Sequence, residues 1–267
     1  MISALSEKEK GTLVSVITPT YNSSQFIVDA LESVLAQRFQ DWEMLIVDDC
    51  STDSTVEIVS RYAAQDDRIK VTLLSENSGA AVARNTAIKA AKGRYIAFLD
   101  SDDIWLPHKL ETQLDFMTEH NSSFCFSNYD RIDEKGVILG HWVVPKQVTY
   151  KQLLKNPVIG CLTAIYDTQK LGKVEMPLIR KRQDFGLWLR LLKKTQHAYG
   201  IQESLARYRV HRNSMSAKKF SAVSYTWLLY RKVEKLSMPV SVYCFSHYVV
   251  RALLKAKLPG VVKFFKV

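Results

Sequence analysis

The sequence has few cysteines, and their spacing excludes two classes of protein. Its 267 residues contain 4 cysteines with no Cys-x-x-Cys pair: Cys50, Cys125, Cys161 and Cys244. Disulfide scaffolds need many cysteines in a short chain, and zinc sites usually need close pairs of them. Neither class fits, and a reducing cytosol is the compartment that we expect.

Long apolar runs are also missing. The longest uncharged run near the end, Leu236–Val250, has 15 residues and includes Pro239 and His247, whereas a helix that spans a bilayer needs about 20 apolar residues. The first 13 residues lack the apolar core of a signal peptide. We therefore expect no transmembrane helix and no secretion. With 47% hydrophobic residues, 10 glycines and 7 prolines, the composition also excludes collagen-like and disordered chains.

The positive charge is concentrated at one end of the chain. Residues 180–267 hold 19 Lys and Arg against 3 acids, net +16, while residues 1–179 hold 18 against 24, net −6. Such a basic region is typical of proteins that face nucleic acid, anionic lipid or a phosphorylated substrate. Composition alone leaves these three partners open.

The first hundred residues alternate apolar runs with helical patterns. Continuous apolar strands separated by helices predict an α/β fold with a mostly parallel central sheet flanked by helices. The expected strands are 14–18, 42–47, 69–74 and 95–99, with helices at 26–37, 55–64 and 80–91. Further along we expect a helix from Pro107 to Glu119, strands at 124–128 and 137–144, a helix at 185–194 and two helices after Ser221.

Polar residues follow several of these strands, where α/β sheets bind their ligands. Asp100 and Asp102 follow the fourth strand, and alternate residues of an extended chain point to the same side. Their carboxylates are able to hold a divalent cation, whose open coordination positions would accept the oxygens of a diphosphate. The alternative is that these acidic residues cap the helix that follows. Asp49 after the second strand suits a base N–H, and Arg84 suits a phosphate; helix capping and a solvated face are the respective alternatives.

Four segments in this order resemble the family 2 glycosyltransferases, which have the GT-A fold. They are Pro19–Asn22, Val47–Asp53, Asn77–Asn85 and Gly93–Trp105. The resemblance covers about residues 12–215 and implies one nucleotide-sugar-binding catalytic domain, which we place at residues 1–217. Residues 218–267 would form a basic, helical C-terminal extension.

The resemblance also implies roles for single residues. Pro19 and Tyr21 would flank the nucleoside, Asp49 would face the base, and Arg84 would lie near the diphosphate with Ser101. Asp100 and Asp102 match the DxD motif, and Mn²⁺ or Mg²⁺ is the expected cofactor, with Asp102 as a direct ligand joined by Asp100 and His211.

Two later segments resemble further motifs of the family. Gln183, Asp184 and Trp188 resemble the (E/Q)D-x-x-x-W motif, whose Asp is the catalytic base in inverting members. Capping of the helix that follows is the alternative for Asp184. The segment Tyr208–Ser216 resembles a YRxHxxSxS motif, in which three residues would close over the diphosphate or metal: Arg209, His211 and Ser214.

Aromatic residues near these motifs are candidates for sugar stacking. Trp105, next to the acidic motif, is the stronger candidate for the sugar or acceptor site. For Trp188, core packing is the safer interpretation. Gln183 is placed with them on the acceptor side.

The basic extension alternates Lys and Arg with large apolar residues, as amphipathic helices at anionic membranes do. We expect a protein at the inner face of the cytoplasmic membrane, although packing on the catalytic domain explains the same pattern.

The expected function is metal-dependent, inverting transfer of a sugar from a nucleotide sugar, with UDP as the nucleotide, to a saccharide or polyprenyl-diphosphate-linked acceptor. The setting implied by the resemblance is bacterial surface polysaccharide, O-antigen or lipopolysaccharide synthesis. The alternatives are a nucleic-acid-binding protein and a sugar nucleotidyltransferase. No nucleic-acid-binding motif is visible, and the first strand lacks the glycine-rich phosphate loop that the second alternative requires.

Overall fold

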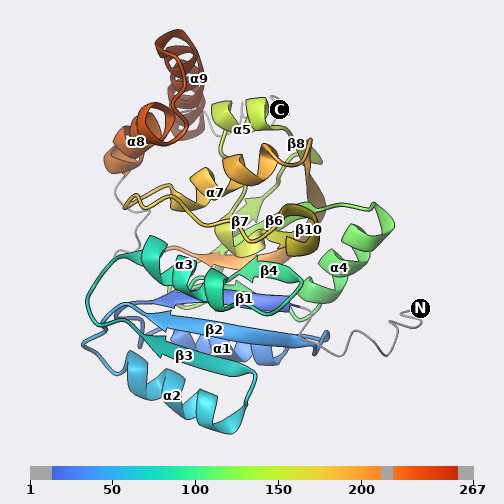
Figure 1. Ribbon diagram of the computed structural model, residues 1–267, viewed down its shortest axis with the longest axis vertical. Helices are drawn as coiled ribbons and strands as arrows, with labels where there is room; N and C mark the ends of the chain where they lie inside the picture. The colour runs from blue at the N-terminus through green and yellow to red at the C-terminus, as the bar shows by residue number, and fades with distance from the viewer. Residues whose placement is uncertain (1–13, 212–218, 258–267) are drawn as a thin grey trace.

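The computed structural model describes residues 14–211 and 219–257, which form a mixed α/β fold around one ten-stranded sheet (Figure 1). Eight strands follow one another in the order β3 (Ile69–Leu73), β2 (Trp42–Asp48), β1 (Val14–Thr20), β4 (Tyr95–Phe98), β9 (Ile165–Asp167), β6 (Phe124–Ile132), β10 (Ala198–Arg209) and β5 (Ile104–Trp105). β7 (Ile138–Trp142) pairs with β6, and β8 (Gln147–Val148) pairs with β10.

The first half of the sheet matches the sequence prediction. β1 pairs in parallel with β2 and β4, and β2 pairs in parallel with β3, as expected for buried strands joined by helices. The connecting helices are α1 (Ile27–Leu35), α2 (Thr55–Gln65) and α3 (Ala80–Ala90). All four predicted strands are confirmed within two residues at each end.

The second half contains elements that the sequence prediction missed. α4 (Lys109–Glu119) and α7 (Gln183–Leu192) were expected, but α5 (Tyr150–Lys155), α6 (Thr168–Leu171) and the 3-10 turn η2 (Cys161–Thr163) were not. β9 runs antiparallel to both β4 and β6 and joins the two halves of the sheet. The 12-residue strand β10 was also missed, because register shifts break its pairing with β6 and polar residues interrupt its apolar pattern.

The parallel strands end at one edge of the sheet, at the left of Figure 1. Thr20 pairs with Asp48 across β1 and β2, and the backbone N–H of Leu74 donates to the carbonyl of Asp48 at 2.9 Å. Three successive strand ends are therefore aligned, and the loops that follow them share this edge with the loop after β4.

The C-terminal helices pack on the α/β body. α8 (Lys219–Leu228), the π-helix η3 (Leu229–Val233) and α9 (Met238–Lys257) lie together at the top of Figure 1. Leu229, Tyr230 and Cys244 are buried in the same hydrophobic cluster as the inner face of α7. The boundary that we place between residues 217 and 218 lies outside the described residues.

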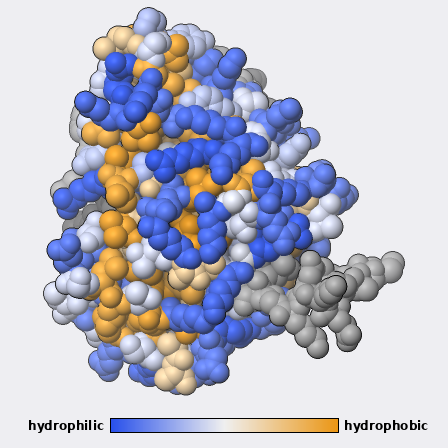
Figure 2. Space-filling model, in the orientation of Figure 1, coloured by the Kyte–Doolittle hydropathy of each residue, from blue (hydrophilic) through white to orange (hydrophobic). Residues whose placement is uncertain are grey.

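Hydrophobic side chains also reach the surface. Figure 2 shows them in a band along the left margin of the molecule, from the C-terminal helices down to the ends of β2 and β3. None of the helices within the described part of the chain combines the length and apolarity that crossing a membrane requires.

A lysine is buried inside the fold, below the acidic end of β4. The Lys109 ammonium lies 4.1 Å from the centre of the Trp105 ring and donates to the side-chain oxygen of Gln113. Gln113 in turn donates to the carbonyl of Thr163 at 2.9 Å, which ties α4 to η2. Burial lowers the pKa of Lys109 from 10.5 to about 7.

This shift predicts a pH-dependent effect of Lys109→Met. Between pH 7 and 10.5 the unfolded chain holds a proton on Lys109 that the folded chain lacks, so the stability of the wild type rises with pH across this range. The free energy of unfolding of the variant relative to the wild type should fall by roughly 3 kcal/mol between pH 6 and 9.5. Urea unfolding at both pH values measures this difference; equal differences for Lys109→Met and for the exposed control Lys151→Met would contradict it.

Candidate active site

Three carboxylates gather at the end of β4. Asp100 and Asp102 are partly exposed, with side chains 26% and 28% accessible, whereas Asp103 is buried. Burial, together with the negative charge of Asp100, raises the pKa of Asp102. Burial and both neighbouring carboxylates raise the pKa of Asp103 further. The loop therefore concentrates negative charge where the strand ends.

Side chains from distant segments contact these carboxylates. Arg84 of α3 is almost fully buried and pairs with Asp100 at 2.5 Å, while Nε2 of His211 lies 2.8 Å from Oδ2 of Asp102. The Nε of Arg84 is buried without a partner among the described residues. Arg84 therefore still has a hydrogen-bond donor to offer beside the two carboxylates.

Arg209 supports the acidic loop from below. Its side chain is 2% exposed, and its guanidinium donates to the carbonyl of Asp102 at 2.9 Å, to the carbonyl of Glu134 at 3.0 Å and to Asp29 at 2.6 Å. Its backbone N–H donates to Asp103 at 2.9 Å. Sequence reasoning placed Arg209 over the diphosphate. The structure instead commits it to internal contacts, through which it positions Asp102. Ser214, the third residue of that group, lies outside the described residues.

The loops after β1 and β2 form the neighbouring part of the edge. Tyr21 is exposed just beyond Pro19, and the hydroxyls of Ser23 and Ser101 are 2.7 Å apart, which ties the β1 loop to the acidic loop. The carboxylate of Asp49 accepts the N–H groups of Ser78 and Gly79 at 2.7 and 2.8 Å. Asp49 thus holds the entry to α3, and its contact with a base stays a prediction.

Gly79 itself has a positive φ of 88°, a conformation that glycine adopts without strain, and it starts the helix that carries Arg84. In the β2 loop, Asp53 accepts the N–H of Thr55, the first residue of α2, at 3.0 Å.

Asp184 lies in the first turn of α7. It is half-buried and forms no hydrogen bond or ion pair within the parts of the chain that the structure describes. Arg84 interacts electrostatically with both Asp100 and Asp184. The structure therefore brings the predicted base and the predicted DxD motif to the same guanidinium.

Cys161 is a residue of this site that sequence reasoning missed. It starts η2 and interacts with Asp100, Asp184 and Arg84. Burial and the charge of Asp100 raise the pKa of its thiol, so it stays protonated at neutral pH. A lone cysteine in an unpredicted turn carries no sequence signal, and only the antiparallel return of β9 brings it to the edge.

Burial rules out a sugar contact for Trp105 and agrees with the core-packing interpretation of Trp188. Trp105 is 2% exposed and donates from Nε1 to the carbonyl of Leu162 at 2.8 Å, and Trp188 is 1% exposed and packs against Phe98 and Phe124. Gln183 is also buried. A buried ring offers no face to a sugar, so both tryptophans serve the core.

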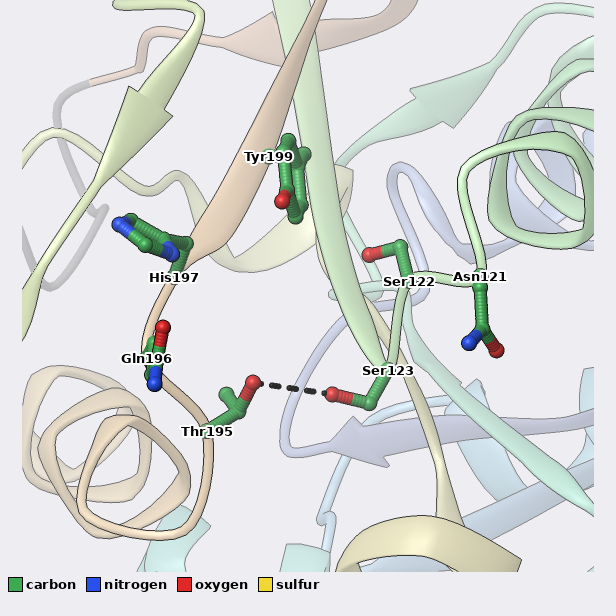
Figure 3. Close-up of a pocket in the computed structure, with 7 residues that line it drawn as sticks. All are labelled: Asn121, Ser122, Ser123, Thr195, Gln196, His197 and Tyr199. Atoms are coloured by element: carbon green, nitrogen blue, oxygen red, sulfur yellow. Dashed lines mark hydrogen bonds between the residues drawn. The ribbon is translucent and has the colours of Figure 1, made fainter.

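Two hollows lie outside this edge. One of about 220 Å³ has a polar lining between the starts of β6 and β10, where the hydroxyls of Ser123 and Thr195 are 3.2 Å apart (Figure 3). It is at the opposite end of these strands from the acidic loop. The other, of about 510 Å³, is bordered by Asp29, Glu134 and Arg209.

Comparisons with known proteins identify the family. Residues 15–167 match the family described as Glycosyl transferase family 2. The chain is 49% identical over 244 residues to "Putative teichuronic acid biosynthesis glycosyltransferase TuaG" of Bacillus subtilis, covering 91% of this chain and 97% of the relative. It is 42% identical over 216 residues to "UDP-Glc:alpha-D-GlcNAc-diphosphoundecaprenol beta-1,3-glucosyltransferase WfgD" of Escherichia coli, covering 80% and 84% of the two chains.

The fold has solved counterparts. The crystal structure of S. aureus TarS 1-349 in complex with UDP-GlcNAc superimposes with a TM-score of 0.70 at 22% identity, over 92% of this chain and 76% of that one. Its fold is GT-A, as the sequence predicts for this chain. The chain belongs to glycosyl transferase family 2 and is a glycosyltransferase.

Proposed function

We propose that this glycosyltransferase moves a sugar from a UDP-sugar to a lipid-linked saccharide during synthesis of a bacterial surface polysaccharide, with inversion at the anomeric carbon. The observation that carries the proposal is that Arg84 pairs with Asp100 and also interacts electrostatically with Asp184. Arg84 thus connects two parts of the site. Asp100 and Asp102 are suited to hold the cation that binds the leaving diphosphate, and Asp184 has a free carboxylate that is suited to take the proton of the attacking hydroxyl.

The chemistry requires a base on one face of the sugar and a stabilised leaving group on the other. Asp184 accepts the proton of the acceptor hydroxyl as its oxygen attacks the anomeric carbon, and the nucleoside diphosphate leaves on the opposite face. Asp184 lies in the first turn of α7, half-buried and without a hydrogen-bond or ion-pair partner among the described residues. Arg84 offers its unpartnered Nε to the diphosphate.

The donor set fits a divalent cation. Asp102 offers a carboxylate and His211 an imidazole nitrogen, with Asp100 beside them, and the crowded negative charge favours a cation. Asp102, Asp100 and His211 would hold the cation; within residues 14–211 and 219–257 no cluster of three or more His, Cys, Asp or Glu side chains is arranged as a metal site. When bound, Mn²⁺ or Mg²⁺ would neutralise the charge of the leaving diphosphate.

The names of related proteins support the choice of substrates. WfgD is named for UDP-Glc as donor and a diphosphoundecaprenol-linked sugar as acceptor, TuaG for teichuronic acid biosynthesis, and the TarS complex contains UDP-GlcNAc. A mannosyltransferase from Pyrobaculum calidifontis, similar in fold with a TM-score of 0.67, was solved with GDP-Man and Mn²⁺. Neither the nucleic-acid-binding nor the nucleotidyltransferase alternative is favoured by these relatives.

Asp184→Asn tests the assignment of the base. The amide cannot accept the proton, so kcat for transfer should fall by at least 100-fold, while the affinity for UDP stays within about twofold. Asp115→Asn, an exposed carboxylate on α4, is the matched control and should leave both values unchanged. Substantial transfer by Asp184→Asn would place the base elsewhere.

We also propose that α9 rests on the anionic inner face of the cytoplasmic membrane. Its exposed apolar residues are Met238, Val240, Val242, Tyr243 and Val250. The helix contains no acidic residue, and Lys232 and Lys235 are exposed just before it. Apolar side chains flanked by cations are typical of helices that lie in the membrane interface.

Substitution is a better test of membrane binding than truncation, because Leu229, Tyr230 and Cys244 belong to the core. The double variant Val242→Asp, Val250→Asp should lower co-sedimentation with phosphatidylglycerol vesicles at least tenfold, since it buries charge instead of apolar surface. Val143→Asp, at a more exposed valine that directly follows β7, is the control. Unchanged vesicle binding by the double variant would refute the role of α9.

A further inference from the structure

The loop that leads into α7 is fixed at its base and exposes a leucine. The backbone N–H and carbonyl of Met176 are both bonded to the buried side chain of Asn85, at 2.7 and 2.9 Å. Pro177 packs so closely on Gly186 that a Cβ at position 186 would overlap its ring. Leu178, the next residue, is 72% exposed. A single exposed leucine is common on protein surfaces, but this one is held outward by its anchored neighbours.

Cations without carboxylate partners follow this leucine. Arg180 is exposed and forms no hydrogen bond or ion pair with the residues that the structure describes. Arg182 donates to the hydroxyl of Tyr248 at 2.6 Å, a neutral partner, and its Nε is buried with no partner among the described residues. A partly buried guanidinium next to neutral groups favours the binding of an anion.

This loop is close to the candidate base. Arg180 is four residues before Asp184, so their Cα atoms are at most about 14 Å apart. The backbone of Arg182 is left-handed, with a φ of 66°, and α7 begins directly after it. Non-glycine residues persist in this conformation where surrounding contacts hold them, and here Tyr248 of α9 supplies one. The cations are thus presented beside Asp184, on the side of the site that meets α9.

We infer that Leu178, Arg180 and Arg182 bind the diphosphate-lipid part of the acceptor: the arginines hold the diphosphate and Leu178 contacts the lipid chain. This rests on the proposed function. An acceptor sugar whose hydroxyl reaches Asp184 carries its anomeric diphosphate about one ring width away, on the side of the loop. Planar guanidinium groups bind phosphate oxygens in a bidentate way, which an ammonium does not.

The donor side of the site has its own nitrogen side chains. Arg84 is paired with Asp100, and His211 lies against Asp102, at the end of β4. Arg180 and Arg182 contact neither carboxylate. Their loss should therefore affect the acceptor and spare the donor.

Two matched acceptors test the inference on the full chain. One is α-GlcNAc joined through a diphosphate to a medium-length alkyl alcohol, and the other is the alkyl α-glycoside of GlcNAc without the diphosphate. We expect the wild type to prefer the diphosphate acceptor. Arg180→Gln should raise the KM for the diphosphate acceptor at least tenfold. The kcat, the KM for the UDP-sugar and the KM for the plain glycoside should stay within twofold of the wild-type values. Arg61→Gln, an exposed arginine on α2, is the control.

Leu178 is tested by the length of the alkyl chain. A longer chain should lower the KM of the wild type, and Leu178→Ser should remove most of this gain. If catalysis with either acceptor is too slow to follow, calorimetric binding of the diphosphate acceptor in the presence of UDP provides the same comparison between the wild type and Arg180→Gln.

Three results would overturn the inference: no preference of the wild type for the diphosphate acceptor, an equal effect of Arg180→Gln on both acceptors, or no effect on either. If Arg180→Gln lost binding to phosphatidylglycerol vesicles but kept the preference of the wild type for the diphosphate acceptor, the loop would be assigned to phospholipid binding instead. Measurements with the donor separate failure of this inference from failure of the proposed function. If the proposed function were wrong, the wild type would neither bind UDP nor hydrolyse UDP-glucose or UDP-GlcNAc.

Discussion

Crowding of negative charge at the end of β4 is the constraint on which the rest of the site depends. Asp100, Asp102 and Asp103 follow one another so closely that their ionised forms repel, and burial of Asp103 increases the cost. Each is balanced by a group from a different part of the chain: Arg84 on α3, His211 after β10, and the backbone N–H of Arg209. The acidic loop therefore keeps its shape only when α3, β4 and β10 are assembled, and a bound cation would relieve the charge that remains.

The same balance explains the uneven charge of the sequence. The acidic residues of the first part of the chain supply the site, and the basic second part supplies the groups that surround it. Arg209 neutralises Asp29 and supports Asp102 from inside the fold. Arg180 and Arg182 stand beside the base instead, and α9, which contacts Arg182 through Tyr248, carries the exposed apolar surface. This contact joins the proposed membrane face directly to the helix that carries Asp184.

The sequence predicted the first half of the fold well because local patterns determine it. β1 to β4 are buried runs between amphipathic helices, and the polar residues at their ends signal the ligand edge. The second half depends on contacts between distant residues. β10 is interrupted by register shifts, Cys161 reaches the site because η2 packs beside the distant strands β4 and β10, and Arg209 acts through partners as distant as Asp29. Trp105 was misassigned for a related reason: in sequence it follows the acidic motif closely, whereas in space its neighbours are Leu162 and Lys109.

The central claim is that the acidic end of β4 holds a nucleoside diphosphate together with a divalent cation. Calorimetric titration of the full chain with UDP, in Mn²⁺ and again in excess chelator, tests it most directly. The account predicts that UDP binds in Mn²⁺, and that either the chelator or Asp102→Ala weakens binding at least tenfold. Equal affinity for UDP under all three conditions, or no binding in Mn²⁺, would contradict it.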